Sequence, residues 1–162
     1  MRIAVVSDTH LPRGRRQLPE RLVEECSAAD LILHAGDFSV LSVLVELELL
    51  GPVQAVLGNT DDDDLAARLP VELVVDAAGV RIGMVHNSGP KDGRAERLRE
   101  RFPDCRAVVF GHSHLPLIEQ HGDLLLVNPG SATEHRGRAP VCTMAVLEIA
   151  DGRLTATLID LP

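Results

Sequence analysis

Five short apolar runs of this sequence each end just before side chains that can bind a metal ion. Runs of this length are typical of strands that are covered on both faces. Asp, His and Asn in repetition at strand ends serve no packing purpose, so they constrain both the fold and the chemistry. The runs and the residues that follow them are 3–6 before Asp8 and His10, 31–33 before His34 and Asp37, 53–57 before Asn59 and Asp61, 80–85 before His86, and 106–110 before His112 and His114.

The first half of the chain alternates strands with helices. A helix that starts near Pro19 follows strand 3–6, and a helix over about 40–50 follows strand 31–33 and precedes strand 53–57. This β-α-β-α-β order predicts a right-handed, largely parallel sheet. Ligand sites of such sheets lie at the carboxyl ends of the strands.

Hairpins and one charged surface helix at 94–101 are predicted for the rest of the chain. We expect this half to be mainly antiparallel, and two mixed sheets packed face to face, with helices outside, accommodate both halves. The strand pairs and their turns are 71–75 with 80–85 across 76–79, 117–119 with 124–127 across 121–123, and 142–149 with 154–159 across 151–152.

The composition excludes several classes of protein. With 162 residues, 45% of them hydrophobic, we expect a single domain over residues 1–162. The net charge of −8 and the absence of Trp and Tyr disfavour a stable complex with nucleic acid, and the charge also disfavours anionic membranes. No apolar stretch approaches the ~18 residues of a membrane span, and Met1-Arg2 leads at once into a strand rather than a signal peptide. A cytoplasmic protein is therefore expected.

The three cysteines are Cys26, Cys105 and Cys142, which are widely spaced and form no C-x-x-C. This spacing indicates neither a disulfide framework nor a thiolate zinc site. We expect reduced cysteines that pack against apolar neighbours.

The candidate ligands favour hard or borderline divalent cations, because they are carboxylates, imidazoles and an amide. Seven are too many for one ion and suit two, and two dications ~3.5–4 Å apart form the clamp used for displacement at phosphorus. A structural site is the alternative, although four ligands would saturate it. The seven are Asp8, His10, Asp37, Asn59, His86, His112 and His114.

Other polar residues are open to two interpretations. His34 is expected to be a core imidazole or to support a ligand, and His121 to be a turn residue. The arginines at 13, 15 and 16 are either a contact for a substrate anion or a solvated patch. In the run of four carboxylates at 61–64, which is expected to cap a helix at 65–68, we single out only Asp61.

These motifs together resemble the calcineurin-like metallophosphoesterase superfamily. The resemblance spans nearly the whole chain. The segment 128–131, Asn-Pro-Gly-Ser, is similar to a motif of the small prokaryotic phosphodiesterase branch of this superfamily. The resemblance implies an α/β fold, a four-layer α/β/β/α sandwich of two mixed β-sheets flanked by helices. The ordered motifs are D-x-H at 8–10, G-D at 36–37, G-N-x-D at 58–61, the lone His86, and G-H-x-H at 111–114.

The resemblance also implies a binuclear metal site. Asp37 would bridge two divalent ions, Mn²⁺ first among candidates that include Fe, Zn, Ni and Mg. Asp61 would orient its neighbours without binding metal. One ion would be completed by Asp8, His10 and His114, and the other by Asn59, His86 and His112, and the catalytic set would be Asp37, Asn59, Asp61 and His112.

The mechanism implied by the resemblance is hydrolysis by a metal-activated water or hydroxide, with a bridging hydroxide attacking phosphorus opposite the leaving oxygen. The chain departs from the family pattern at Thr60, where many members have a histidine that protonates the leaving group. We therefore expect diesters whose leaving groups need little protonation. Two further departures are the segment 87–90, where the branch often has Gly-His, and the segment 134–136, Glu-His-Arg, in place of a Pro-Arg pair. His135 or Arg136 could substitute for that pair.

A phosphodiesterase that acts on small, nucleotide-like diesters is the first hypothesis. A phosphomonoesterase is the second, which the missing acid at position 60 and the lack of a cap domain disfavour. The third is a binding scaffold, since a eukaryotic membrane-coat subunit shares this fold with an impaired metal site. Every ligand position here holds a competent residue, which favours catalysis. Self-association stays open, with the C-terminal hairpins as a candidate edge for a homo-oligomer.

Overall fold

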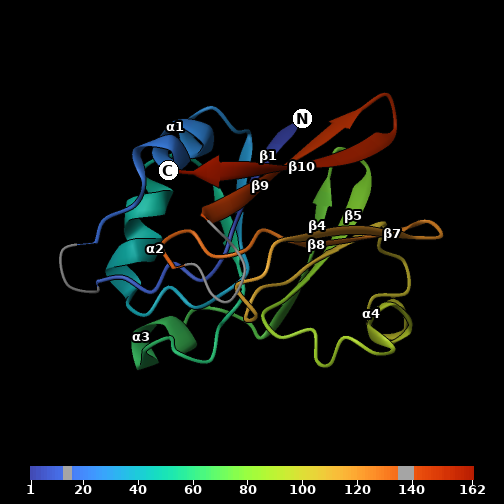
Figure 1. Cartoon of the computed structure of the whole chain (residues 1–162), viewed down its shortest axis with the longest axis horizontal. Helices are drawn as coiled ribbons and strands as arrows, with labels where there is room; N and C mark the ends of the chain where they lie inside the picture. Colours follow the sequence, from blue (N-terminus) through green and yellow to red (C-terminus); the bar gives the residue numbers. More distant parts are fainter. Residues whose placement is uncertain (13–15, 135–140) are drawn as a thin grey trace.

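The computed structural model describes residues 1–12, 16–134 and 141–162, and its strands form two mixed five-stranded sheets (Figure 1). The first sheet has the order β10-β9-β1-β2-β3. Its β1, β2 and β3 are parallel, whereas β9 pairs antiparallel with both β1 and β10. These strands are β1 (Arg2–Val6), β2 (Leu31–His34), β3 (Val53–Ala55), β9 (Cys142–Ala150) and β10 (Arg153–Leu161).

The second sheet has the order β4-β5-β6-β8-β7. The predicted hairpins β4–β5 and β7–β8 form its antiparallel edges, but its centre is parallel, because β6 pairs with both β5 and β8 in that sense. The second half of the chain is thus less uniformly antiparallel than expected. These strands are β4 (Glu72–Ala77), β5 (Val80–Val85), β6 (Ala107–Val109), β7 (Leu117–His121) and β8 (Leu124–Asn128).

Helices cover the outer faces of the two sheets (Figure 1). Apolar residues of α1 and α2 share a buried cluster with the first sheet, and α4 shares one with the second. The predicted α/β/β/α order of layers is confirmed. The described helices are α1 (Glu20–Ser27), α2 (Leu41–Glu48), α3 (Asp63–Ala66) and α4 (Arg94–Arg101), and none is long and apolar enough to cross a membrane.

The core follows the two-residue period of the strands. In β1, Ile3 and Val5 face the second sheet and join a buried cluster with Met84, while Ala4 and Val6 face the helices. Because both faces of β1 are covered, its apolar run is continuous rather than alternating. All three cysteines are free; Cys26 and Cys105 are buried in apolar clusters and Cys142 packs against one, as predicted.

Two predicted elements are shorter than expected. The helix expected over 40–50 covers 41–48, and the strand expected over 53–57 ends at Ala55. Val56 N–H still donates to the His34 carbonyl, but Leu57 N–H donates to Pro70, outside the sheet. The chain therefore leaves the sheet before it reaches Asn59.

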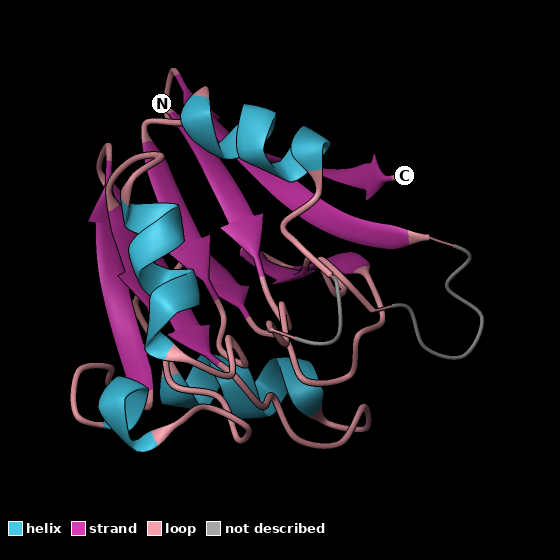
Figure 2. Cartoon of the chain, turned by 90° about the vertical axis from the view of Figure 1, so that its left-hand side faces the viewer, coloured by secondary structure: helices cyan, strands magenta, loops and turns pink. Residues whose placement is uncertain are grey.

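The parallel pairings bring several strand ends to one end of the molecule. Val6 pairs with His34 and His34 with Ala55, so β1, β2 and β3 end side by side, and in the second sheet Met84 pairs with Val109. Figure 2 shows these strands running into loops at the same end of the molecule. The loops after β1, β2, β3, β5 and β6 are those that carry the candidate ligands.

Candidate metal centre

All seven predicted ligand side chains lie together at these strand ends. Neighbouring donor atoms are separated by 2.8–3.6 Å along a continuous series of contacts from Asp8 to His112. In order, the contacts are Asp8 Oδ1–His114 Nε2 at 3.2 Å, His114 Nε2–His10 Nε2 at 3.2 Å, His10 Nε2–Asp37 Oδ2 at 3.6 Å, Asp37 Oδ2–His86 Nε2 at 3.4 Å, His86 Nε2–Asn59 Oδ1 at 3.1 Å and Asn59 Oδ1–His112 Nδ1 at 2.8 Å.

Asp8, His10 and His114 form the first donor group, with ligand atoms within 4.8 Å of one another. The Oδ2 atom of Asp8 accepts hydrogen bonds from the Ser7 hydroxyl and the His112 N–H, at 2.6 and 3.0 Å. Its Oδ1 atom is buried and makes no hydrogen bond, although His114 Nε2 lies 3.2 Å away. A buried, unpaired carboxylate oxygen is costly, and a cation held with the two imidazoles would satisfy it.

The charge of Asp8 is well defined. Burial acts to raise the pKa of its carboxyl, but the imidazoles of His10 and His114 and the Ser7 hydroxyl outweigh burial and hold that pKa below its usual range. Asp8 is therefore an anion at neutral pH, as a metal ligand must be.

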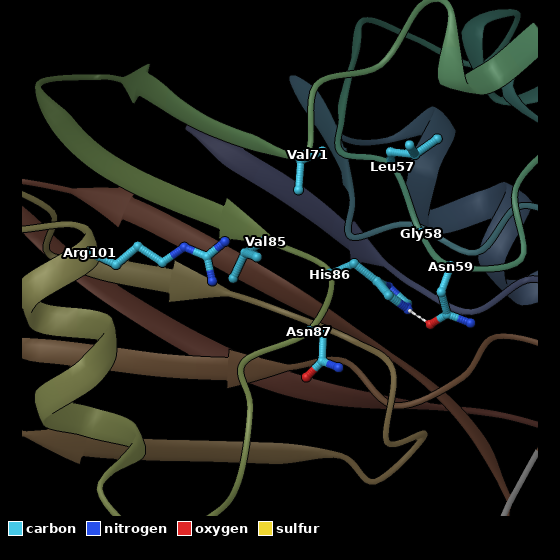
Figure 3. Close-up of a pocket in the computed structure, with 8 residues that line it drawn as sticks. All are labelled: Leu57, Gly58, Asn59, Val71, Val85, His86, Asn87 and Arg101. Carbon is cyan, nitrogen blue, oxygen red and sulfur yellow. Dashed lines mark hydrogen bonds between the residues drawn. The ribbon is translucent and has the colours of Figure 1, made fainter.

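Asp37, His86, Asn59 and His112 form the second donor group. The Nδ1 atom of His86 lies 2.7 Å from the Ala35 carbonyl oxygen, so Nδ1 carries the proton and Nε2 keeps its lone pair. That lone pair faces Asn59 Oδ1, as Figure 3 shows, and also Asp37 Oδ2, and both of these oxygens are acceptors. Converging acceptors require a proton or a cation between them, so this donor set also fits a divalent ion.

The pKa values of the Asp37–His86 pair shift in opposite directions. Burial lowers the pKa of His86, but the adjacent Asp37 carboxylate outweighs burial and the net shift is upward. Burial raises the pKa of Asp37, but His86 and the Thr60 N–H outweigh it and the net shift is downward. The pair thus attracts positive charge to the space between the two side chains.

The Asp37 carboxylate lies between the two donor groups. Its Oδ2 atom is 3.6 Å from His10 Nε2 on one side and 3.4 Å from His86 Nε2 on the other. Its Oδ1 atom accepts a hydrogen bond from Thr60 N–H at 2.9 Å, which fixes the orientation of the carboxylate.

Asp61 holds the backbone beneath this carboxylate. Its Oδ2 atom accepts hydrogen bonds from the N–H groups of Gly58 and Asp37, at 2.7 and 3.2 Å, and its Oδ1 atom accepts one from Ser39 at 2.9 Å. Its neighbour Asp62 instead caps α3 through a 2.9 Å hydrogen bond from Leu65 N–H. The capping expected of the 61–64 run is thus performed by one residue, and Asp61 contacts the loops.

Five of the seven candidate ligands have left-handed backbone conformations. Such conformations cost about 1–2 kcal/mol for a non-glycine residue and cluster at functional sites. Loop hydrogen bonds sustain them, for example those from Asp8 N–H to the Gly36 carbonyl and from His10 N–H to the Asp37 carbonyl, both at 3.0 Å. The φ angles are 53° at Asp8, 45° at His10, 61° at Asp37, 69° at His112 and 58° at His114.

Two glycines allow the loops to approach this closely. A Cβ on Gly58 would lie 2.1 Å from both the amide nitrogen and the Oδ1 atom of Asp37, and one on Gly111 would lie 1.9 Å from the Ser7 Oγ atom. Neither position can hold a side chain without moving a candidate ligand or its support.

Most of the groups that join the loops to each other were not predicted from the sequence. Ser131 Oγ donates to the Asp8 carbonyl at 2.6 Å, Thr133 Oγ1 to the Thr9 carbonyl at 2.5 Å, and Asn128 Nδ2 to the Gly111 carbonyl at 2.9 Å. The Asn-Pro-Gly-Ser segment was the available signal, but we interpreted it only as a family motif.

His34 is a core imidazole that supports the site, as predicted. It is fully buried, stacks on Phe38 at 3.5 Å between ring centroids, and accepts a hydrogen bond from Gly36 N–H at its Nδ1 atom. Burial lowers its pKa to about 3, so the ring is neutral. His121 ends β7, next to the predicted turn, and contacts Glu119.

The basic cluster is only partly described. The Arg16 guanidinium lies 2.7 Å from a Glu134 carboxylate oxygen, and so does not stand alone as an anion contact. Arg13, Arg15, His135 and Arg136 lie outside the described residues.

Comparison with known proteins identifies the family. The sequence model of the calcineurin-like phosphoesterase superfamily domain matches residues 1–152. The chain belongs to the calcineurin-like phosphoesterase superfamily. Among its relatives, a protein of Methanothermobacter thermautotrophicus named "Probable metallophosphoesterase" is 35% identical over 161 residues, which cover 98% of this chain and 92% of that protein.

Two further proteins extend the comparison. The protein named "Phosphodiesterase MJ0936" of Methanocaldococcus jannaschii is 24% identical over 91% of this chain and 93% of its own length. The crystal structure of Chaetomium thermophilum Vps29 superposes with a TM-score of 0.79 over 99% of both chains at 18% identity, a likeness of fold alone. As a phosphoesterase of this superfamily, the chain has the Asp/His clusters of a divalent metal site.

Proposed function

We propose that the protein is a phosphodiesterase that uses two divalent cations to hydrolyse small phosphodiesters. The observation that supports this most is the placement of the Asp37 carboxylate between two donor groups, 3.6 Å from His10 Nε2 and 3.4 Å from His86 Nε2. A structural ion would need only one of these groups. The name of the Methanocaldococcus phosphodiesterase supports the diester substrate.

The donor set divides between two ions. Asp8, His10 and His114 would hold one, Asn59, His86 and His112 the other, and Asp37 would contact both. Imidazole, carboxylate and amide donors suit hard or borderline divalent ions, and from the family resemblance we propose Mn²⁺ first, with Fe, Zn, Ni and Mg as alternatives. Bound divalent ions supply a lowered pKa for a reacting water and positive charge for the phosphoryl oxygens.

The protein's own residues orient the reactants. The Ala35 carbonyl fixes the tautomer of His86, and Asp61 acts as a positioning residue through the backbone of Asp37. Asn59 and His112 are exposed at the rim of the site, where their polar atoms can meet a phosphoryl oxygen.

Net charge favours an anionic substrate at this position. Two dications contribute +4 and the carboxylates of Asp8 and Asp37 contribute −2, which leaves about +2 in a chain of net charge −8. A small phosphodiester, nucleotide-like in our proposal, would be drawn to this point. We also propose that residues 1–162 form one catalytic domain and that the protein acts in the cytoplasm.

Thr60 supports a preference for diesters with good leaving groups. Its hydroxyl lies 3.3 Å from His10 Nδ1, at the edge of the site. A threonine hydroxyl is not an acid at neutral pH, so this position supplies no proton to a departing alkoxide. Monoesters and diesters with poor leaving groups should therefore react slowly.

The test is the initial rate of bis(p-nitrophenyl) phosphate hydrolysis by chelator-stripped protein, alone and with Mn²⁺, Fe²⁺, Zn²⁺, Ni²⁺ or Mg²⁺. We expect metal-dependent turnover, slower hydrolysis of a dialkyl phosphate whose alkoxide leaving group needs a proton, and loss of activity in Asp37→Asn. Asp64→Asn is the matched control, because Asp64 is exposed and belongs to the adjacent carboxylate run. A folded protein that binds two ions yet turns over no diester would contradict the proposal and favour a scaffold.

A further inference from the structure

A pocket of about 280 Å³ opens beside the second donor group (Figure 3). Asn59 and His86, two of the proposed ligands, line its inner end. In the close-up, the Arg101 side chain extends from α4 toward Val85, on the opposite side of the pocket from Asn59. A phosphate group at the proposed metal site would therefore lie at the inner end, and any group attached on that side would extend into the pocket.

The walls of the pocket are mainly apolar. Leu57, Val71 and Val85 line it between the two polar ends. Val85 is buried, and Val71 is 62% exposed at the mouth. Apolar walls favour an organic group over a hydrated ion, and a methyl group would leave most of the volume unfilled.

The Arg101 guanidinium gives the far end of the pocket its polarity. The Glu72 carboxylate lies 2.5 Å from one terminal nitrogen of Arg101 and holds the side chain in place. A guanidinium has five N–H donors and no acceptor, so this one contact leaves most of its donors for other partners. In a bound ligand, the group that meets these donors would be a hydrogen-bond acceptor, either a carbonyl or an anion.

We propose that this pocket binds one ester group of the substrate, and that the group is an organic ring of about nucleoside size with a hydrogen-bond acceptor near Arg101. The inference rests on the proposed phosphodiesterase function, because it places the phosphorus beside Asn59 and His86. It assigns the nucleoside-sized group of that substrate to one pocket, and it makes Arg101 and Val71 determinants of specificity.

The test compares two phosphate monoesters that share the phosphate and differ only in the ester group. Thymidine 5′-phosphate carries a ring system with carbonyl acceptors, whereas methyl phosphate carries neither. Calorimetry on the Mn²⁺-loaded protein measures both dissociation constants without requiring turnover. We expect thymidine 5′-phosphate to bind at least tenfold tighter than methyl phosphate.

Arg101→Gln should weaken the binding of thymidine 5′-phosphate by about tenfold, because one charge-assisted hydrogen bond is lost. The affinity for methyl phosphate should not change. Arg99→Gln is the matched control, since Arg99 lies on the same helix, is 34% exposed against 35% for Arg101, and pairs with Asp123 away from the pocket. Glu72→Gln replaces the ion pair by a neutral hydrogen bond that can still hold the Arg101 guanidinium, and should retain tight binding. Val71→Phe narrows the mouth and should also weaken only the thymidine ester.

The outcomes separate this inference from the proposed function. Equal affinity for both esters, or equal loss for both in Arg101→Gln, would overturn the pocket assignment even if bis(p-nitrophenyl) phosphate is hydrolysed. A preference for thymidine 5′-phosphate that depends on Arg101 and Val71 would support the pocket. If that preference were seen without any diester turnover, the reaction assigned to the centre would be wrong and the pocket would stand.

Discussion

Replacing Asp61 by Asn tests whether the metal centre depends on a carboxylate that does not bind metal. Asp61 accepts three backbone hydrogen bonds, two at Oδ2 from Gly58 and Asp37 and one at Oδ1 from Ser39. Asparagine has one oxygen and an NH₂ group, so one of these two positions must become a donor. The orientation that loses least keeps the oxygen toward Gly58 and Asp37 and turns the NH₂ group toward Ser39 N–H.

The magnitude follows from these contacts. One charge-assisted hydrogen bond to a partly buried N–H is lost, at about 1.5–3 kcal/mol, and the two that remain lose their charge. We expect Asp61→Asn to lower the free energy of unfolding by about 2–4 kcal/mol. Since the hydrogen bond from Asp37 N–H then ends on a neutral amide oxygen instead of a carboxylate, the loop that carries Asp37 is held less firmly, and Mn²⁺ affinity and turnover should each fall by about 10–100-fold.

Two measurements check this prediction. Urea unfolding of the chelator-treated protein gives the change in stability, and Mn²⁺ titration calorimetry gives the affinity. Asp62→Ala should cost about 1 kcal/mol through loss of the α3 cap without a change in Mn²⁺ affinity, and the exposed Asp64→Asn should change neither. Wild-type Mn²⁺ affinity and stability in Asp61→Asn would refute the reasoning.

Two further perturbations test the packing beneath the site. Gly58→Ala places a Cβ 2.1 Å from Asp37 Oδ1 and should lower turnover by about 100-fold, because it displaces that ligand. Gly51→Ala is the control and should keep wild-type turnover, since its Cβ would meet only Ile32 at 3.8 Å and a backbone oxygen at 4.0 Å. Equal activities of the two variants would show that the loop around Gly58 adapts to the added methyl group. Burial lowers the pKa of His34 to about 3 in the folded protein, whereas the same side chain has a pKa near 6.5 in the unfolded chain. As the pH falls, the unfolded state therefore binds a proton at His34 that the folded state does not. The contribution of neutral His34 to stability is fully present above the unfolded-state pKa of about 6.5. The free energy of unfolding should drop by about 2 kcal/mol between pH 7 and 5 in chelator-treated protein. In urea unfolding, this drop of about 2 kcal/mol should be absent from His34→Gln. His121→Gln, at an exposed position, should show the same pH dependence of stability as the wild type. An unchanged dependence in His34→Gln would place the proton uptake elsewhere.

Most elements of the fold follow from local patterns in the sequence. The helix predicted over 94–101 is found at Arg94–Arg101, and both arms of the predicted C-terminal hairpin are present in β9 and β10. These features are set by neighbouring residues, through hydrophobic period, turn residues and helix-stop signals. The limits of β3 were less predictable, because Leu57 leaves the sheet for a partner at Pro70.

The pairing of distant strands did not follow from local patterns. The parallel contact between β6 and β8 places Val109 against Val127, and β9 joins β1 with Ala4 against Val146. Nothing in either strand alone selects its partner, because any apolar strand offers the same backbone donors and acceptors. Selection comes from the burial of both faces between the other layers.

The sequence by itself determined the residue types at the strand ends and hence the chemistry they can perform. The sequence motifs also singled out Asp61 from its run of carboxylates, but only the tertiary structure decided which backbone groups it holds, and that Asp62 caps a helix while Asp64 lies in solvent. It also decided that Arg101, from a helix read as a charged surface, lines a pocket beside His86. The physical reason is that ligand chemistry belongs to the side chain, whereas contact and burial depend on residues that are far apart in the sequence.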